Sequence, residues 1–178
     1  MKIFRSLLVA GAAIALLSGC GSNNAEDSTA APAAQTDAVT SASIVNQADA
    51  FTKAVSAEGN WIVAILNDLT LDQDVVVAGE FHDKGTAENA IYRKLALYAQ
   101  DADHKITATY TLTAPKVTVQ SENFRVQGGT IKGDVYVEAN GFNLYKDATI
   151  DGNLYFASEA IKESAAVDGK VTGTTGIK

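Results

Sequence analysis

The sequence of 178 residues is poor in the residue types that most often carry catalytic or metal chemistry. It has one cysteine and two histidines, His82 and His104. A single cysteine cannot form a disulfide within the chain, and no Cys-x-x-Cys or His-Glu-x-x-His spacing is present. Both histidines lie in segments that favour loops. We therefore predict no metal site, no cofactor and no thiol chemistry in this chain.

Basic residues are also scarce. Lysine and arginine together number 14 against 21 aspartate and glutamate residues, which gives a net charge of −7 at pH 7. Nucleic-acid-binding domains need clustered positive charge, so this balance argues against a nucleic-acid partner. Gly128, Gly129 and Gly133 lack the GxxxxGK[ST] or GxGxxG spacing of a phosphate-binding loop. Bends between strands explain these glycines better.

The first residues have the pattern of an export signal. Lys2 and Arg5 precede an apolar stretch, residues 7–17, that is too short to span a bilayer comfortably. The stretch ends in Leu17-Ser18-Gly19-Cys20, which resembles the lipobox of bacterial lipoproteins. The resemblance implies a signal peptide over residues 1–19, cleavage after Gly19 and a lipid on Cys20. An ordinary secretory signal that happens to precede a cysteine is the alternative.

A lipidated Cys20 would hold the mature protein on the extracytoplasmic face of the cell membrane, or on the outer membrane if the host has one. Without Lys2 and Arg5 the chain keeps 12 basic and 21 acidic residues, a net charge of −9. Anionic lipid repels this charge, so attachment would depend on the acyl chains. Two or more chains are needed for stable anchoring.

Residues 20–43 and residues 44–178 differ in composition. The first segment is small and polar, and it lacks the large apolar residues that would offset the entropy of ordering, so we expect a disordered tether. In the second segment, Phe51, Ala54 and Val55 have helical spacing and predict a short helix over 46–57. The apolar run 61–66 predicts a buried strand. Short alternating runs separated by Gly, Asn and Asp then predict an all-β domain.

An internal repeat is the most informative feature of residues 44–178. IKGDVYV begins at Ile131, IDGNLYF at Ile150 and VDGKVTG at Val167, with starts 19 and 17 residues apart, and a weaker copy covers 71–77. No copy can bury its apolar face alone, whereas stacked copies form a continuous core. The pattern predicts a small parallel β-solenoid, with a β-sandwich as the alternative. The predicted core column comprises Leu71, Val75, Val77, Ile131, Val135, Val137, Ile150, Leu154, Phe156 and Val167.

One segment, about residues 79–112, interrupts the repeat. Within it, residues 94–100 and 105–112 alternate between apolar and polar side chains, and they flank Asp101-Ala102-Asp103-His104. This pattern is typical of a β-hairpin, preceded by one or two helical turns over residues 86–93. A longer helix that continues to Tyr98 is the alternative, because Ile91, Leu95 and Tyr98 also fit a helical stripe. The solenoid is therefore expected to carry an inserted hairpin.

The copies IKGDVYV and IDGNLYF resemble the coils of bactofilins, which are polymer-forming bacterial cytoskeletal proteins, and those of secreted lipoproteins with bactofilin-like repeats. The resemblance covers roughly residues 69–171. It implies a small right-handed β-helix and assembly head to head or edge to edge. The chain departs from the bactofilins in its export signal, its smaller number of regular coils and its insertion.

Three functions remain open. The first is a non-enzymatic, lipid-anchored scaffold that binds an envelope protein or associates with itself through the C-terminal end of the solenoid. The second is a cell-wall glycan-binding module in which Tyr136, Tyr145 and Tyr155 stack against sugar rings. The third is a polysaccharide-acting enzyme. Its candidate carboxylates occupy turn positions that favour aspartate for backbone reasons; they are Asp134, Glu138, Asp151 and Asp168.

Overall fold

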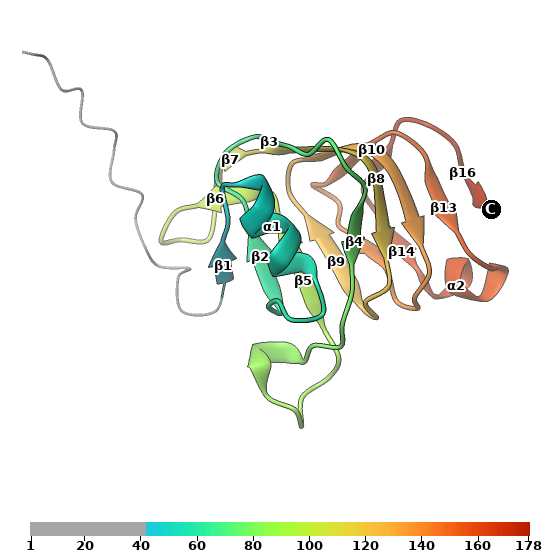
Figure 1. The fold of residues 1–178 in the computed structure, drawn as a ribbon, viewed down its shortest axis with the longest axis horizontal. Helices are drawn as coiled ribbons and strands as arrows, with labels where there is room; N and C mark the ends of the chain where they lie inside the picture. The colour runs from blue at the N-terminus through green and yellow to red at the C-terminus, as the bar shows by residue number, and fades with distance from the viewer. Residues whose placement is uncertain (1–41) are drawn as a thin grey trace, which may run out of the picture. The chain divides into compact units, whose positions relative to one another are not determined.

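The computed structural model describes residues 42–178, and most of its strands pair in parallel (Figure 1). The predicted signal peptide, Cys20 and nearly all of the predicted tether lie outside these residues. Every described residue belongs to one structural unit, residues 35–178. No helix in the described part has both the length and the apolar character needed to cross a membrane.

Six parallel strands form one sheet, here called sheet A. Each strand is short, and its buried side chains are aliphatic or aromatic with the exception of Arg93. The order across the sheet follows the order in the sequence. The strands are β1 (Ala42–Ile44), β2 (Ile62–Ala64), β5 (Arg93–Ala96), β9 (Phe124–Gln127), β11 (Asn143–Leu144) and β14 (Ala166–Val167).

Eight parallel strands form the second sheet, sheet B, around two long central strands, β8 (Thr111–Val119) and β10 (Thr130–Val137). Pairs of shorter strands align end to end beside them. Thus β3 (Leu69–Thr70) and β4 (Val75–Val77) flank β8, while β12 (Thr149–Asp151) and β13 (Leu154–Phe156) flank β10. Outermost are β15 (Lys170–Val171) and β16 (Thr175–Ile177).

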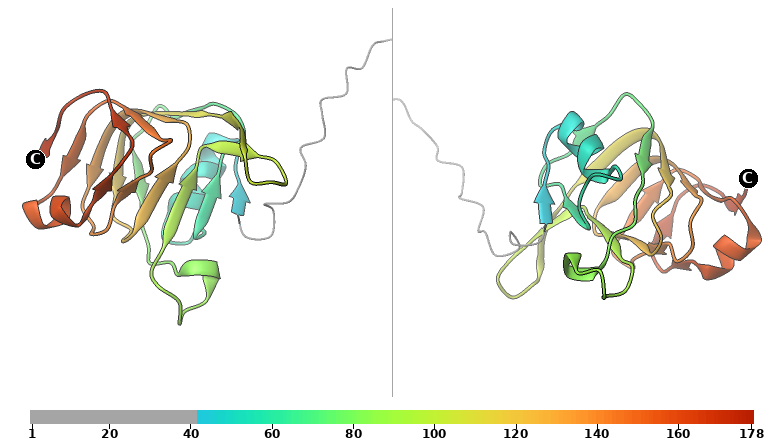
Figure 2. Two further views of the ribbon diagram at one scale, coloured as in Figure 1. Left: turned by 180° about the vertical axis from the view of Figure 1, so that it is seen from behind. Right: turned by 60° about the horizontal axis from the view of Figure 1, so that its bottom comes forward.

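From β2 onward the chain alternates between the two sheets. We call one sheet A strand together with the next sheet B strands a coil, and the strands of successive coils lie side by side in the views of Figure 2. Inward side chains stack in register, as Leu112, Ile131 and Ile150 do. These three are fully buried. The predicted core column is confirmed except at Val167.

The prediction of the third copy of the repeat is wrong. Ile150 pairs with Val171 rather than Val167, and Val167 pairs with Leu144 on sheet A. Val167 is also 39% exposed. The coil between Ile150 and Val171 spans 21 residues because it contains the helix α2 (Glu159–Ser164).

Three glycines, one in each of the last three coils, stack on one another along sheet B. A Cβ atom on Gly133 would lie 1.9 Å from the Ala114 carbonyl oxygen. One on Gly152 would lie 2.2 Å from the Gly133 oxygen, and one on Gly173 would lie 2.6 Å from the Gly152 oxygen. Glycine is required here because neighbouring backbones approach too closely for any side chain.

The predicted hairpin is confirmed but is shorter than expected. Strands β6 (Tyr98–Gln100) and β7 (Ile106–Thr109) pair antiparallel. The strands on either side, β5 and β8, belong to sheets A and B. We call a segment that leaves the two sheets an excursion, and the hairpin is one. A second excursion, residues 78–92 between β4 and β5, contains the 3₁₀ turn η1 (Asp83–Gly85). Residues 79–112 are therefore two excursions separated by a sheet strand, not one insertion.

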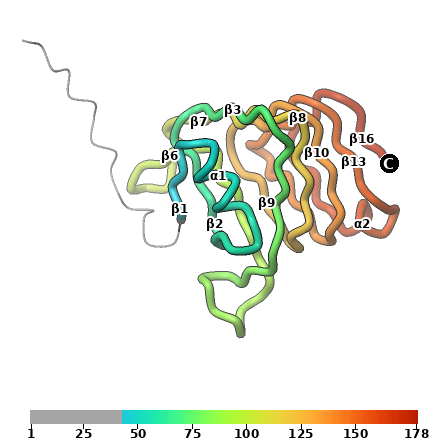
Figure 3. The backbone as a smooth tube through the Cα atoms, in the orientation of Figure 1, coloured from blue at the N-terminus to red at the C-terminus, as the bar shows by residue number. Residues whose placement is uncertain are grey.

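The predicted N-terminal helix is confirmed as α1 (Ala48–Val55), with Phe51, Ala54 and Val55 buried as expected. It contacts β2 and β4, one strand from each sheet. The tube in Figure 3 shows α1 near the first strands, with the later coils following toward β16. Helix α1 thus covers the N-terminal side of the core.

Candidate functional site

Two of the predicted site residues, Tyr136 and Tyr155, meet on the outer face of sheet B. They occupy equivalent positions on β10 and β13, between inward-facing residues, and they are register partners. Their ring centroids are 5.1 Å apart, with the planes tilted by 44°. Both side chains are partly buried. The expected pairing of these two tyrosines is confirmed, and it follows from their place in the repeat.

Lys178 lies across this tyrosine pair. Its Nζ is 4.5 Å from the Tyr155 ring centroid and 5.4 Å from the Tyr136 centroid, and it donates a hydrogen bond of 3.0 Å to the Tyr136 hydroxyl. That hydrogen bond raises the pKa of Lys178. A ligand ring that stacked on the tyrosines from this side would have to displace the Lys178 ammonium.

Tyr145 does not join the pair. It follows β11 of sheet A, and its ring contacts the guanidinium of Arg125 at 5.1 Å and the ammonium of Lys146 at 5.7 Å. The three tyrosines therefore do not form one stacking face. Spacing within the repeat distinguishes them, because only Tyr136 and Tyr155 occupy the same position in successive copies.

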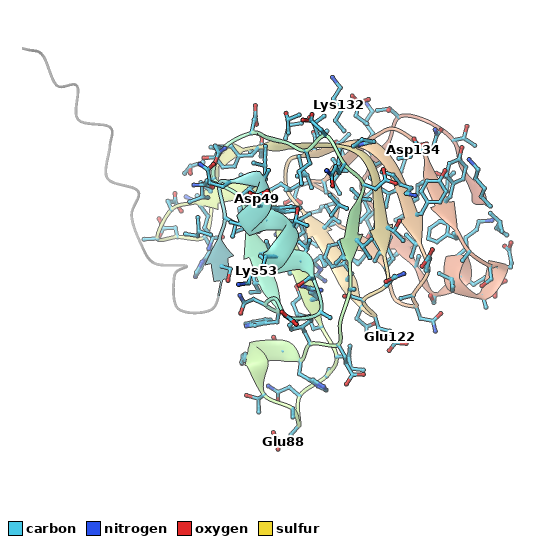
Figure 4. The ribbon with its side chains drawn as sticks, in the orientation of Figure 1. Asp49, Lys53, Glu88, Glu122, Lys132 and Asp134 are labelled. Carbon is cyan, nitrogen blue, oxygen red and sulfur yellow. The ribbon has the colours of Figure 1, made fainter. Side chains whose placement is uncertain are left out.

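Three of the four candidate carboxylates accept hydrogen bonds from a neighbouring coil. Asp134, which is labelled in Figure 4, accepts hydrogen bonds of 2.9 Å from both the backbone N–H and the side-chain amide of Asn153. Glu138 accepts from Gln120, and Asp151 accepts from Thr172, each at 2.9 Å. These bonds tie each coil to the next. Asp168 follows β14 on sheet A and lies apart from the others.

The two histidines lie in separate excursions. His82 Nδ1 is 2.7 Å from the Asn89 carbonyl oxygen, and its Nε2 is 3.3 Å from Glu80. The hydrogen bond to Asn89, with a smaller contribution from Glu80, raises the pKa of His82. His104 lies in the turn between β6 and β7. Over residues 42–178, no three His, Cys, Asp or Glu side chains are placed to hold a metal ion.

The C-terminal side of the core is less covered than the N-terminal side. Within residues 42–178, β14, β15 and β16 each pair with a strand on one side only; β1, β3 and β4 do so at the other end, but there α1 packs beside β2 and β4. The apolar side chains of Val167 and Ile177 on these strands are 39% and 48% exposed. They stand in register with the buried residues Leu144 and Phe156. The core column therefore ends in an apolar surface.

Comparison with protein-family models, curated proteins and solved structures finds no match to this chain.

Proposed function

We propose that the chain is a small right-handed β-solenoid that acts as a non-enzymatic, lipid-anchored scaffold and associates with itself at the cell envelope. The parallel pairing and the alternation between sheets A and B support the solenoid. Parallel strands joined through a crossover are right-handed in nearly all proteins, which supports the handedness. The use of Asp134, Glu138 and Asp151 in bonds between coils favours a structural over a catalytic role.

The exposed C-terminal end of the core is the observation that carries the proposal. An unpaired strand edge beside apolar side chains is a template for association unless charge or a covering element blocks it. Only five large apolar side chains are exposed in residues 42–178, and Val167 and Ile177 on the last coil are two of them. Because α1 covers the opposite end, we propose that two C-terminal ends meet about a two-fold axis.

Sedimentation of residues 35–178 at increasing concentration tests this association. We expect a reversible dimer, which Val167→Lys with Ile177→Lys should weaken about tenfold or more, since lysines on an edge oppose strand pairing. The control is Val76→Lys with Ile106→Lys, because these side chains are comparably exposed but lie elsewhere. It should leave the dimer unchanged.

Two results would count against this arrangement. Weakening by Ile44→Lys, on the exposed β1 edge, would indicate head-to-tail filaments instead of a two-fold dimer. A strict monomer at high concentration would contradict self-association altogether.

The proposed anchor is Cys20, on the basis of the Leu17-Ser18-Gly19-Cys20 segment. Replacing Cys20 with serine is expected to abolish incorporation of a labelled fatty acid and to leave an uncleaved precursor, because the thiol is the only site for the lipid. Metabolic labelling followed by electrophoresis measures both effects. Undiminished label on the variant would remove Cys20 from this role.

A glycan-binding module remains the second candidate, supported by the adjacent Tyr136 and Tyr155 rings. If the protein is monomeric, retention on purified cell-wall material should fall when both tyrosines are replaced by alanine. Lys178→Ala should increase retention in the same assay, because it uncovers the rings. Retention that none of these substitutions changes would exclude the tyrosine pair as the binding surface.

A further inference from the structure

Two positive side chains lie next to each other on the outer face of sheet A. Lys94 on β5 and Arg125 on β9 are register partners in adjacent parallel strands. Like charges that face each other across strands are destabilising. Neither residue takes part in any of the three ion pairs formed within residues 42–178. The sheet therefore retains an electrostatic repulsion that no described carboxylate neutralises at ion-pair distance.

The surroundings of Lys94 disfavour its charged form on balance. Burial, and secondarily the charge of Arg125, lower the pKa of Lys94. Asp147 acts in the opposite direction, but it is bonded to the backbone N–H of Gly128 at 2.9 Å. An anion placed between Lys94 and Arg125 would relieve the repulsion directly.

Tyrosines surround the two cations. The Arg125 guanidinium lies 5.1 Å from the ring centroid of Tyr145 and 5.8 Å from that of Tyr92. Lys94 Nζ donates a hydrogen bond of 2.8 Å to the hydroxyl of Tyr98. All three tyrosines are partly buried. They hold the cations in place. Because the cations lie over the ring faces, these tyrosines offer hydroxyl groups and ring edges to a ligand.

Both cations keep donors for a ligand. Arg125 donates through Nε to the side-chain oxygen of Asn143 at 3.1 Å, which fixes the plane of the guanidinium. Its four terminal N–H groups outnumber their one partner within residues 42–178, the Tyr92 hydroxyl, whose pKa is raised by burial and lowered in part by this interaction. Lys94 uses one of its three N–H groups on Tyr98. A carboxylate or phosphate accepts several such charge-assisted hydrogen bonds at once.

We propose that Lys94 and Arg125 bind the oxyanion of an acidic saccharide, whose sugar hydroxyl groups form hydrogen bonds with the neighbouring tyrosine hydroxyls. The oxyanion is the carboxylate of a uronic acid or a sugar phosphate. The site is on sheet A, whereas Tyr136 and Tyr155 are on sheet B. It does not depend on self-association. Because the chain has a net charge of −7, an acidic ligand needs a local concentration of positive charge, which this pair supplies.

Calorimetric titration of the purified full chain tests the site with three probes: trigalacturonate, glucose 6-phosphate and neutral maltotriose. At least one acidic probe should bind and maltotriose should not, and added salt should weaken the binding. Binding of trigalacturonate alone identifies a carboxylate site, and binding of glucose 6-phosphate alone identifies a phosphate site. If neither acidic probe binds, or if maltotriose binds equally well, the proposal is wrong.

Variants locate the binding on sheet A. Lys94→Gln and Arg125→Gln should each weaken it at least tenfold, with thermal melting confirming that the variants remain folded. Asp147→Asn should strengthen it, since it removes a negative charge that acts on Lys94 and competes with the ligand. The control is Lys132→Gln, because Lys132 is an exposed lysine on sheet B that points away from the core in Figure 4. It should change the affinity less than twofold. Equal weakening by the control and by Lys94→Gln would overturn the assignment.

Discussion

Replacing Arg93 with leucine is expected to lower the free energy of unfolding by about 4 kcal/mol or more, which places it among the most damaging single substitutions in a domain of this size. Arg93 is 1% exposed and has no carboxylate partner among the described ion pairs. Burial lowers the pKa of Arg93 to about 10, so the guanidinium remains charged at neutral pH. A buried charge of this kind persists only if hydrogen bonds compensate its lost hydration.

The compensating bonds connect three parts of the chain. The Arg93 guanidinium stacks on the Phe81 ring at 4.1 Å from its centroid. Its N–H groups donate to the C-terminal end of α1 and the residues that follow it, to the segment after β4 and to the turn after β8. The acceptors are the carbonyl oxygens of Ala54, Ser56, Asn60 and Ala78 and the hydroxyl of Ser121. Leucine would leave these acceptors with no donor from this side chain, and each buried, unsatisfied one costs about 1–3 kcal/mol.

Urea denaturation followed by circular dichroism measures the effect. Arg125→Leu is the matched control, because Arg125 lies on the neighbouring strand but on the partly exposed outer face, where its loss should cost about 1 kcal/mol or less. Arg93→Lys should fall between the two, since lysine keeps the charge with fewer donors. Similar unfolding free energies for Arg93→Leu and Arg125→Leu would show that the network does not hold the coils together.

The sequence allowed the β-rich parallel fold to be predicted because the core residues repeat at the length of a coil. Ile131 and Ile150 pair in register as their 19-residue spacing requires. The next copy could not be recognised by pattern alone. VTGTTGI has Thr175 and Gly176 where the earlier copies have an aliphatic residue and a tyrosine, whereas VDGKVTG keeps the glycine and two valines. The length added by α2 then placed the true copy outside the expected period.

The predicted bounds of the insertion and its hairpin are wrong for a different reason. Residues 94–100 alternate without interruption, but Ala96 ends a strand of sheet A and Tyr98 begins the hairpin. Period-two alternation is the same for a sheet strand and a hairpin strand, so the pattern alone cannot show where the chain leaves one for the other. Only pairing with β2 and β9 assigns residues 93–96 to sheet A.

The candidate sites also differ in how far the sequence alone could predict them. Tyr136 and Tyr155 could be paired from the sequence because they share a position in the repeat, but the covering lysine, Lys178, depends on how the last strand returns to β13. Lys94 and Arg125 are 31 residues apart, with the hairpin and β8 between them. No local sequence pattern indicates that residues 31 positions apart are neighbours, so only the folded sheet shows that these two side chains are adjacent.

Substitution of a stacked glycine is the second change with a large expected effect on stability. Gly152→Val is expected to destabilise the protein by about 3 kcal/mol or to prevent folding, because its Cβ would lie 2.2 Å from the carbonyl oxygen of Gly133 and 2.6 Å from the carbonyl carbon. Both atoms belong to the backbone of the preceding coil, so no side-chain rotation relieves the clash. Gly152 is the best of the stacked glycines for this test, because Gly133 also has a φ of +139°, which would add backbone strain.

Gly176→Val is the matched control. Gly176 lies in β16 of the same sheet, and a Cβ atom there would meet no other atom within 4 Å. Valine favours strands and restricts the unfolded chain more than glycine does, so this variant should be neutral or slightly stabilising. Urea unfolding of both variants at matched m-values compares them directly. The difference between their free energies of unfolding measures the steric cost of moving two coils apart. The substitution is the same at both positions, but only Gly152 has the backbone of another coil close to its Cβ position. Equal stability of the two variants would mean that Gly133 and Gly152 do not stack closely, and it would contradict the coil-on-coil arrangement of sheet B.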